Sequence, residues 1–198
     1  TILTMNAARD VLHGDILIDG SAIRKIGRIS RSDSENAKVI DASGLIVSPG
    51  FVQTHIHLCQ TLFRNLADDL ELLDWLKLKI WPLEGAHSPQ SIALSARLGL
   101  AELIKSGTTT IMDMGTVHHT DYVFSEIESS GIRALCGKAM MDECAGAPES
   151  LKESMKWSID ESLRLKKEWH GRANGRIQFA FAPRFVLSCS EKLLCEVR

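Results

Sequence analysis

The sequence lacks the features that mark membrane, secreted and nucleic-acid-binding proteins. No apolar run approaches the roughly 18 residues that span a membrane. The 198 residues carry 23 basic and 25 acidic side chains, so the net charge of -2 does not favour nucleic acid or an anionic membrane as a partner. The five cysteines are odd in number and form no C-x-x-C pair, which predicts reduced thiols in a cytoplasmic protein. No signal peptide is visible, although the chain starts without a methionine.

Several catalytic motifs are absent as well. The sequence contains no H-E-x-x-H, no P-C-x-x-C of the cytidine-type zinc deaminases, no G-x-G-x-x-G and no phosphate-binding loop. Protease and nucleotide-cofactor interpretations therefore lose their main support. What remains is a composition with 44% apolar and 24% charged residues, typical of a soluble globular protein long enough for an ordinary core.

Residues 1–48 predict a small β module. The stretch DILIDGSAIRKIG alternates apolar and polar residues around Asp19-Gly20, which is typical of a hairpin. The polar stretch RSDSENAK reads as a loop, and VIDASGLIVSPG supplies two further short extended pieces. So few short strands do not bury a core alone.

Residues 49–198 alternate between strand and helix patterns. The signals include Ser88-Pro89 at a helix start, Gly107 and Gly131 at helix ends, and a Ser188–Glu191 capping box. The expected strands are 50–57, 108–114, 132–141 and 176–182, and the expected helices are 70–81 (stopped by Pro82), 88–107, 121–130, 149–169 and one from 188. Within 149–169, one stripe is expected to hold Leu151, Met155, Ile159, Ser162 and Lys166. Such alternation implies right-handed βαβ units and a parallel sheet. Four units make half of a (β/α)8 barrel, so the predicted fold is α/β, with residues 1–48 as a separate β domain and 49–198 as the first four barrel units.

His55 and His57 follow a Pro-Gly turn at the end of the first expected barrel strand. Side chains at i and i+2 of a strand point to one face, so the two imidazoles are expected to project side by side. Barrel active sites lie at the carboxyl ends of the strands. The pair is therefore interpreted as two nitrogen ligands of a metal ion, rather than as an edge-strand pair without a ligand.

The stretch PGFVQTHIHLCQTLFRNLADDLELLDWL, followed by IWPLE, resembles the amidohydrolase superfamily. More narrowly, it resembles the branch that holds adenosine-type deaminases, guanine deaminase and triazine hydrolases. The resemblance extends over essentially the whole chain. It implies that residues 1–48 are part of the small β-sandwich of that family and that the chain reaches the fourth strand of its barrel.

The resemblance also implies one divalent metal ion, zinc or alternatively iron, held in part by His55 and His57. In this family further ligands come from the fifth, sixth and eighth barrel strands, and the proton shuttle also comes from beyond the fourth strand. The ion lowers the pKa of its bound water from about 15.7 to near 7, and the hydroxide attacks an amidine carbon so that ammonia leaves.

Five residues are candidate substrate contacts by the same resemblance. Glu84 matches a glutamate that binds ribose hydroxyls, which suits an acceptor-only carboxylate, and Trp75 lies in the same segment; the alternatives are a solvated carboxylate and a core tryptophan. Arg184, in APRFVLSCS, matches an arginine of guanine deaminase that contacts the base, and it suits an oxo-purine better than adenine; the alternative is a salt bridge at the barrel mouth. Gln60 is a candidate for contacting the ring edge, and capping of the loop is the alternative. Lys138 stands near an arginine of the methylthioadenosine branch.

Three histidines elsewhere receive blander interpretations. His118 and His119 are expected to be loop residues or distal substrate contacts, and His87 has no evident partner.

The predicted function is a metal-dependent aminohydrolase acting on a purine nucleoside such as 5'-deoxyadenosine. The alternatives are a deaminase of guanine or another oxo-heterocycle, a triazine-type hydrolase, and a catalytically incomplete half-barrel. The expected partners are a small purine-like substrate and further copies of the chain, because a half-barrel exposes strand edges and an apolar face.

Overall fold

The computed structural model describes residues 1–143 and 145–198, which divide into two units, Thr1–Gly50 and Phe51–Arg198. Unit 1 contains two antiparallel strand pairs, β1 (Ile2–Leu3) with β2 (Val11–Leu12) and β3 (Asp15–Asp19) with β4 (Ala22–Gly27). The second pair is the hairpin predicted from its turn. Of the two extended pieces expected after the loop, the described residues form only one bridge, between Val47 and Ile2.

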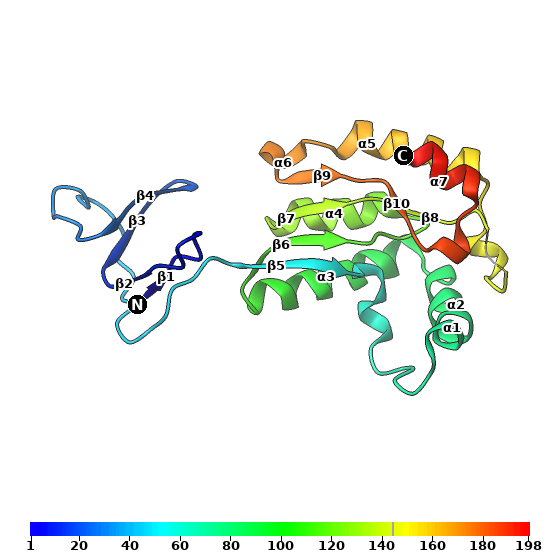
Figure 1. The fold of residues 1–198 in the computed structure, drawn as a ribbon, viewed down its shortest axis with the longest axis horizontal. Helices are drawn as coiled ribbons and strands as arrows, with labels where there is room; N and C mark the ends of the chain where they lie inside the picture. Colours follow the sequence, from blue (N-terminus) through cyan, green and yellow to red (C-terminus); the bar gives the residue numbers. More distant parts are fainter. Residues whose placement is uncertain (144) are drawn as a thin grey trace. The chain divides into compact units, whose positions relative to one another are not determined.

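Unit 2 is built on a parallel sheet with three helices packed along it (Figure 1). Its strands are β5 (Phe51–Ile56), β6 (Thr108–Asp113), β7 (Arg133–Cys136) and β9 (Ile177–Phe179), hydrogen-bonded in that order. The helices α3 (Pro89–Lys105), α4 (Thr120–Ser130) and α5 (Met155–Trp169) follow β5, β6 and the β7 region in sequence. The α/β class and parallel sheet are as predicted, while the described residues form neither a closed barrel nor a sandwich.

The core of unit 2 lies between one face of the sheet and the helices. The strands contribute Ile111, Ala134 and Ile177, and the helices contribute residues such as Phe124 and Leu165. The opposite face is more open, since Met112, the neighbour of the buried Ile111 in β6, is exposed. Apolar burial on the helix side therefore holds the sheet in place, so polar residues at the strand ends are not needed for the core and can form a site.

Local signals place the ends of two helices as predicted. The Ser88 hydroxyl accepts a hydrogen bond from the Ser91 N–H at the start of α3, and α4 ends at Gly131, whose φ of 80° is the left-handed value that glycine tolerates. The predicted Ser188 cap is wrong, because Ser190 caps α7 (Glu191–Val197) by accepting from the Leu193 N–H.

The prediction that Pro82 stops a helix is also wrong. Helical backbone runs through α1 (Leu72–Trp75), the π-helix η2 (Leu76–Ile80) and α2 (Trp81–Gly85). The Trp81 N–H reaches back five residues to the Leu76 carbonyl, and this wider turn just before the proline accommodates a residue that has no N–H. Glu84 is consequently held on a helix rather than in a loop.

Two expected strands are each split in two. After β7 and β9, the chain forms a second small parallel pair, β8 (Ala139–Met140) with β10 (Ala182–Pro183). The break follows from close backbone contacts, because a Cβ at Gly137 would lie 1.8 Å from the Ala180 carbonyl oxygen.

The long helix expected over 149–169 is likewise shorter. A 3-10 turn, η3 (Glu149–Leu151), precedes α5, which Ser154 caps. The buried face of α5 differs from the expected stripe and consists of Ser158, Ser162, Leu165 and Trp169. The remaining short elements are η1 (Leu58–Phe63), α6 (Arg172–Gly175) and η4 (Val186–Ser188). Among the described residues, no helix is long and apolar enough to span a bilayer.

Candidate active site

The two histidines of the expected metal site lie together at the carboxyl end of β5. Their ring centroids are 5.2 Å apart, with His55 exposed and His57 partly buried. The His57 Nδ1 atom is buried and has no hydrogen-bond partner among the described residues, whereas buried polar atoms are normally paired. Two neighbouring imidazoles, one with an unsatisfied nitrogen, fit the donor set of a zinc or iron ion.

Burial also keeps His57 in the form that binds metal. The pKa of His57 is lowered to about 4, first by burial and then by the positive charge of Arg184, while the Glu84 carboxylate acts in the opposite sense. A neutral imidazole is the ligating form, so the ring is ready to bind a cation at neutral pH. Across residues 1–143 and 145–198, no group of three or more histidine, cysteine or acidic side chains is arranged to hold a metal.

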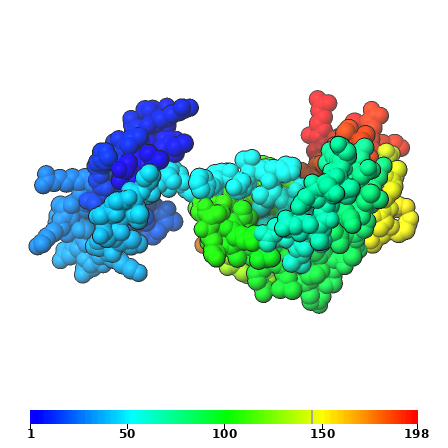
Figure 2. All heavy atoms as spheres, turned by 90° about the horizontal axis from the view of Figure 1, so that it is seen from below, coloured from blue at the N-terminus to red at the C-terminus, as the bar shows by residue number. Residues whose placement is uncertain are grey.

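A groove of about 740 Å³ opens beside the histidines. It is lined by η1 and α3, whose atoms lie next to each other in Figure 2 (cyan and green). Four of the expected site residues line it: His55, His57, Gln60 and Trp75. Trp75 also packs against a buried cluster around Leu76 and Trp81, which agrees with the core role given as the alternative.

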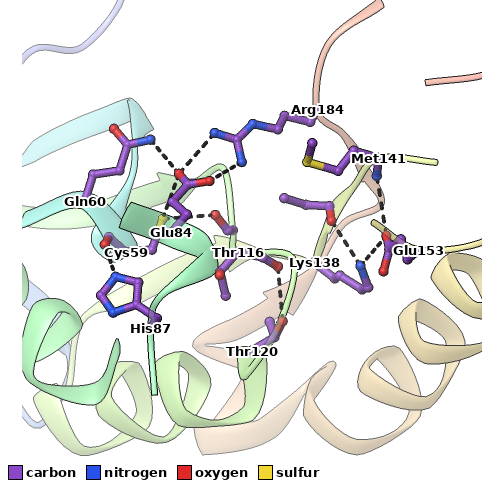
Figure 3. Close-up of polar contacts among 12 residues, drawn as sticks. Cys59, Gln60, Glu84, His87, Thr116, Thr120, Lys138, Met141, Glu153 and Arg184 are labelled. Carbon is purple, nitrogen blue, oxygen red and sulfur yellow. Dashed lines mark hydrogen bonds and ion pairs between the residues drawn. The ribbon is translucent and has the colours of Figure 1, made fainter. Parts of the chain in front are cut away.

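Glu84 and Arg184, which suggested different substrates in the sequence, form one ion pair (Figure 3). The Arg184 Nη1 donates to Glu84 Oε2, and its Nη2 donates to Oε1 at 3.0 Å. The Gln60 side-chain amide donates to the same Oε1 at 2.8 Å, and the Cys59 thiol does so at 3.6 Å. The carboxylate is therefore not solvated, and three of the expected substrate contacts meet at it.

Lys138 lies elsewhere, in a fully buried ion pair with Glu153 (Figure 3). Its Nζ is 2.6 Å from Glu153 Oε1 and donates to the Ala139 carbonyl at 3.1 Å. Burial lowers the pKa of Lys138 while Glu153 raises it. The nearby His118 is half-buried, and burial together with the Lys138 charge lowers its pKa; His119 is an exposed residue preceding α4.

The sequence reading overlooked Asp113, at the carboxyl end of β6. Its carboxylate accepts hydrogen bonds from the Leu58 N–H at 2.8 Å, the Gly115 N–H at 3.1 Å and the Cys136 thiol at 3.3 Å. Burial raises the pKa of Asp113 to about 6. Asp113 thus joins the ends of the neighbouring strands β5, β6 and β7, and its contact with β5 is at Leu58, the residue after His57. The signal that could have identified it is an acidic residue near the end of the strand pattern TTTIMDM.

His87 also has partners that the sequence did not reveal. Its Nε2 donates to the Cys59 carbonyl, and its Nδ1 lies 2.8 Å from the Ser91 hydroxyl. The ring stacks on Phe63, with centroids 5.0 Å apart. His87 therefore fixes η1, the segment that carries Gln60. The four described cysteines, Cys59, Cys136, Cys189 and Cys195, are free thiols, as expected.

Known proteins are similar to this chain in sequence and in fold. The profile of the Amidohydrolase family matches residues 46–198. A 5-methylthioadenosine/S-adenosylhomocysteine deaminase of Carboxydothermus hydrogenoformans is 41% identical over 198 residues, all of this chain and 43% of the relative. A 5'-deoxyadenosine deaminase of Methanobrevibacter smithii is 42% identical over 187 residues, 94% of this chain and 41% of the relative.

Among solved structures, E. coli guanine deaminase superposes with a TM-score of 0.76 at 28% identity, covering 92% of this chain and 42% of that chain. This chain thus spans less than half the length of the curated relatives that it matches. The family match over 153 residues (46 to 198) and the identity near 40% confirm the resemblance drawn from the His-x-His motif. The chain belongs to the amidohydrolase family.

Proposed function

We propose that the complete gene product is a metal-dependent aminohydrolase that deaminates an adenosine derivative such as 5'-deoxyadenosine. The observation that carries this proposal is the 41% and 42% identity to two adenosine-type deaminases over nearly the whole chain. The paired rings of His55 and His57 at the end of β5 support it, because the chemistry needs a metal there. The proposal concerns the complete gene product, since the relatives are more than twice as long as this chain.

His55 and His57 would hold one divalent ion, for which zinc is our first choice and iron the alternative. When bound, the ion supplies Lewis-acid activation of water. Two histidines provide half of the four-coordinate set common for zinc, and no third ligand joins them within the described part of the chain. We therefore expect residues 1–198 alone to be catalytically incomplete.

The other site residues have assigned tasks in this proposal. The Trp75 ring provides an apolar wall for a purine in the groove, and Gln60 contacts the ring edge. Glu84 accepts hydrogen bonds from ribose hydroxyls, as an ionised carboxylate does well. Lys138 is not given a substrate contact, because its charge is spent in a buried pair with Glu153. The free thiols of the cysteines that the structure describes support a cytoplasmic location. The exposed apolar side chains of Phe51 and Val52 support the association of two or more copies of the chain.

The test is ammonia release by the complete gene product loaded with zinc or iron. We expect turnover of 5'-deoxyadenosine, methylthioadenosine or S-adenosylhomocysteine, and loss of turnover in the His55→Ala/His57→Ala variant. A wild-type enzyme with a full metal complement that releases ammonia from none of these nucleosides would contradict the proposal.

A second candidate is deamination of guanine or another oxo-heterocycle. The Arg184 guanidinium favours it, because a planar fork of donors suits a carbonyl oxygen, and the guanine deaminase of E. coli is 28% identical. A triazine-type hydrolase stands behind it. If Arg184→Ala abolished guanine turnover and spared 5'-deoxyadenosine, the second candidate would replace the first.

A further inference from the structure

In the Glu84–Arg184 pair, the arginine occupies the carboxylate oxygens to which the proposed function assigns the ribose hydroxyls. A carboxylate offers about four lone-pair positions. Arg184 occupies both oxygens, and Gln60 and Cys59 donate to Oε1 as well. The side chain of Glu84 is 1% exposed and that of Arg184 is 9% exposed. A ligand that presents two hydroxyls to both oxygens of Glu84 must therefore displace the arginine fork.

The same pair adjoins the groove that opens beside the histidines. Gln60 lines the groove and donates directly to Glu84, so it joins the groove to the ion pair. Figure 3 shows Gln60 and Arg184 approaching the carboxylate from different elements, η1 and the segment after β10.

The backbone holds Arg184 firmly in this position. Its N–H donates to the Met140 carbonyl at 3.0 Å, directly after the β8–β10 pairing. Glu84 is held from the other side by α2, which is 5 residues long and follows the π-helix. Two segments that are 100 residues apart in sequence are thus brought together for this one contact.

We propose that Arg184 is a specificity-determining residue that competes with the sugar hydroxyls of a nucleoside for the carboxylate of Glu84. A ligand with a vicinal diol has to break the bidentate contact before it gains its own hydrogen bonds, whereas a ligand without the diol leaves the pair intact. Arg184 therefore lowers the preference for ribonucleosides over their 2',3'-dideoxy counterparts. This inference rests on the proposed function in one respect, namely that an adenine nucleoside enters the groove.

The test measures binding rather than turnover. The complete gene product is stripped of metal with EDTA so that the ligand is not consumed, and the dissociation constants of adenosine and 2',3'-dideoxyadenosine are measured by calorimetry. The readout is the ratio of the dideoxyadenosine constant to the adenosine constant, which isolates the contribution of the two hydroxyls. In Arg184→Met the Glu84 oxygens no longer bind the guanidinium, so they can accept charge-assisted hydrogen bonds from the two hydroxyls. We therefore expect this variant to raise the ratio by about 10-fold or more.

Two further variants complete the design. Glu84→Leu/Arg184→Met removes the acceptor as well as the competitor, so the ratio should fall to near one. Arg184→Lys keeps the charge but lacks the planar fork, so it should raise the ratio by less than Arg184→Met and provides the test if that variant does not fold. An unchanged or lower ratio in the single variants, or no binding of either nucleoside by any protein, would overturn the inference. Failure of the proposed function shows separately, as absent ammonia release from the metal-loaded wild type.

Discussion

The buried pair of Lys138 and Glu153 permits a sharp test, because the sequence suggested a substrate contact and the structure shows an ion pair. Both side chains are essentially buried, at 0% and 1% exposed, and the Nζ–Oε1 distance is 2.6 Å. Two unit charges at this distance attract by about 6 kcal/mol at an effective dielectric constant of about 20. Desolvation costs several kcal/mol per ion, so the pair as a whole contributes little to the free energy of unfolding.

Removing one partner has a different effect, because the other keeps its desolvation cost without the attraction. In Lys138→Met the carboxylate of Glu153 would retain only the Met141 N–H at 3.4 Å, and its Oε2 already has no hydrogen-bond partner among the described residues. We therefore expect Lys138→Met to lower the free energy of unfolding by about 3–5 kcal/mol. The double variant Lys138→Met/Glu153→Leu should recover most of this loss.

The assay is urea denaturation of the complete gene product at pH 7, and the matched control is Lys156→Met. Lys156 pairs with Asp160 on the surface, where the side chains are 81% and 53% exposed. The control should cost less than about 1 kcal/mol. A loss below about 1 kcal/mol for Lys138→Met, or a double variant less stable than the single one, would refute the reasoning. A raised KM with unchanged stability would restore Lys138 as a substrate contact.

Three further predictions follow from buried or crowded groups. Burial raises the pKa of Asp113 to about 6, so the stability that the protonated Asp113 contributes is lost as the pH rises from 3.8 to 6. Burial lowers the pKa of His57 to about 4, so the stability that the neutral His57 contributes is lost as the pH falls from 6.5 to 4. With EDTA present, Asp113→Asn should therefore make stability rise more steeply between pH 4 and 6.5 than in the wild type; an unchanged slope in urea denaturation would argue against these buried titrations. Gly137→Ala places a Cβ 1.8 Å from the Ala180 carbonyl oxygen and should lower the free energy of unfolding by about 3 kcal/mol or more in the same assay. The control Gly131→Ala, whose Cβ meets no atom within 4 Å, should lower it by about 1 kcal/mol. Equal losses of stability would contradict the close-contact explanation of the split strands. Glu84→Ala should reduce kcat/KM about 10- to 150-fold on nucleosides and less on free bases, measured by ammonia release; equal loss on adenosine and adenine would exclude a ribose contact.

The features that the sequence predicted well depend on neighbouring residues. The Asp19-Gly20 turn, the Ser88 cap and Gly131 each fix a local backbone conformation, so short windows sufficed for the hairpin and the helix ends. The spacing of His55 and His57 likewise predicted adjacent rings, which the 5.2 Å separation confirms.

The features that the sequence did not predict depend on distant contacts. Pro82 is accommodated by a π turn whose formation no local rule requires. Gly137 ends a strand because the Ala180 carbonyl crosses it, 43 residues later in the chain. Glu84 and Arg184 were interpreted first as separate substrate contacts, with a salt bridge as the alternative for Arg184, because nothing in either segment shows that their side chains meet. Contacts between distant segments decide whether a site residue is solvated or paired, and local sequence patterns and residue propensities do not predict such contacts.

Metal stoichiometry tests most directly the proposal that His55 and His57 hold a divalent metal ion. The complete gene product is saturated with zinc, dialysed, and measured by mass spectrometry beside two variants. We expect about one zinc ion per chain in the wild type and in the control His118→Ala/His119→Ala, whose rings are 6.4 Å apart in another part of unit 2. We expect the zinc content of His55→Ala/His57→Ala to fall at least about 10-fold. A His55→Ala/His57→Ala variant that keeps its full zinc content would contradict the account.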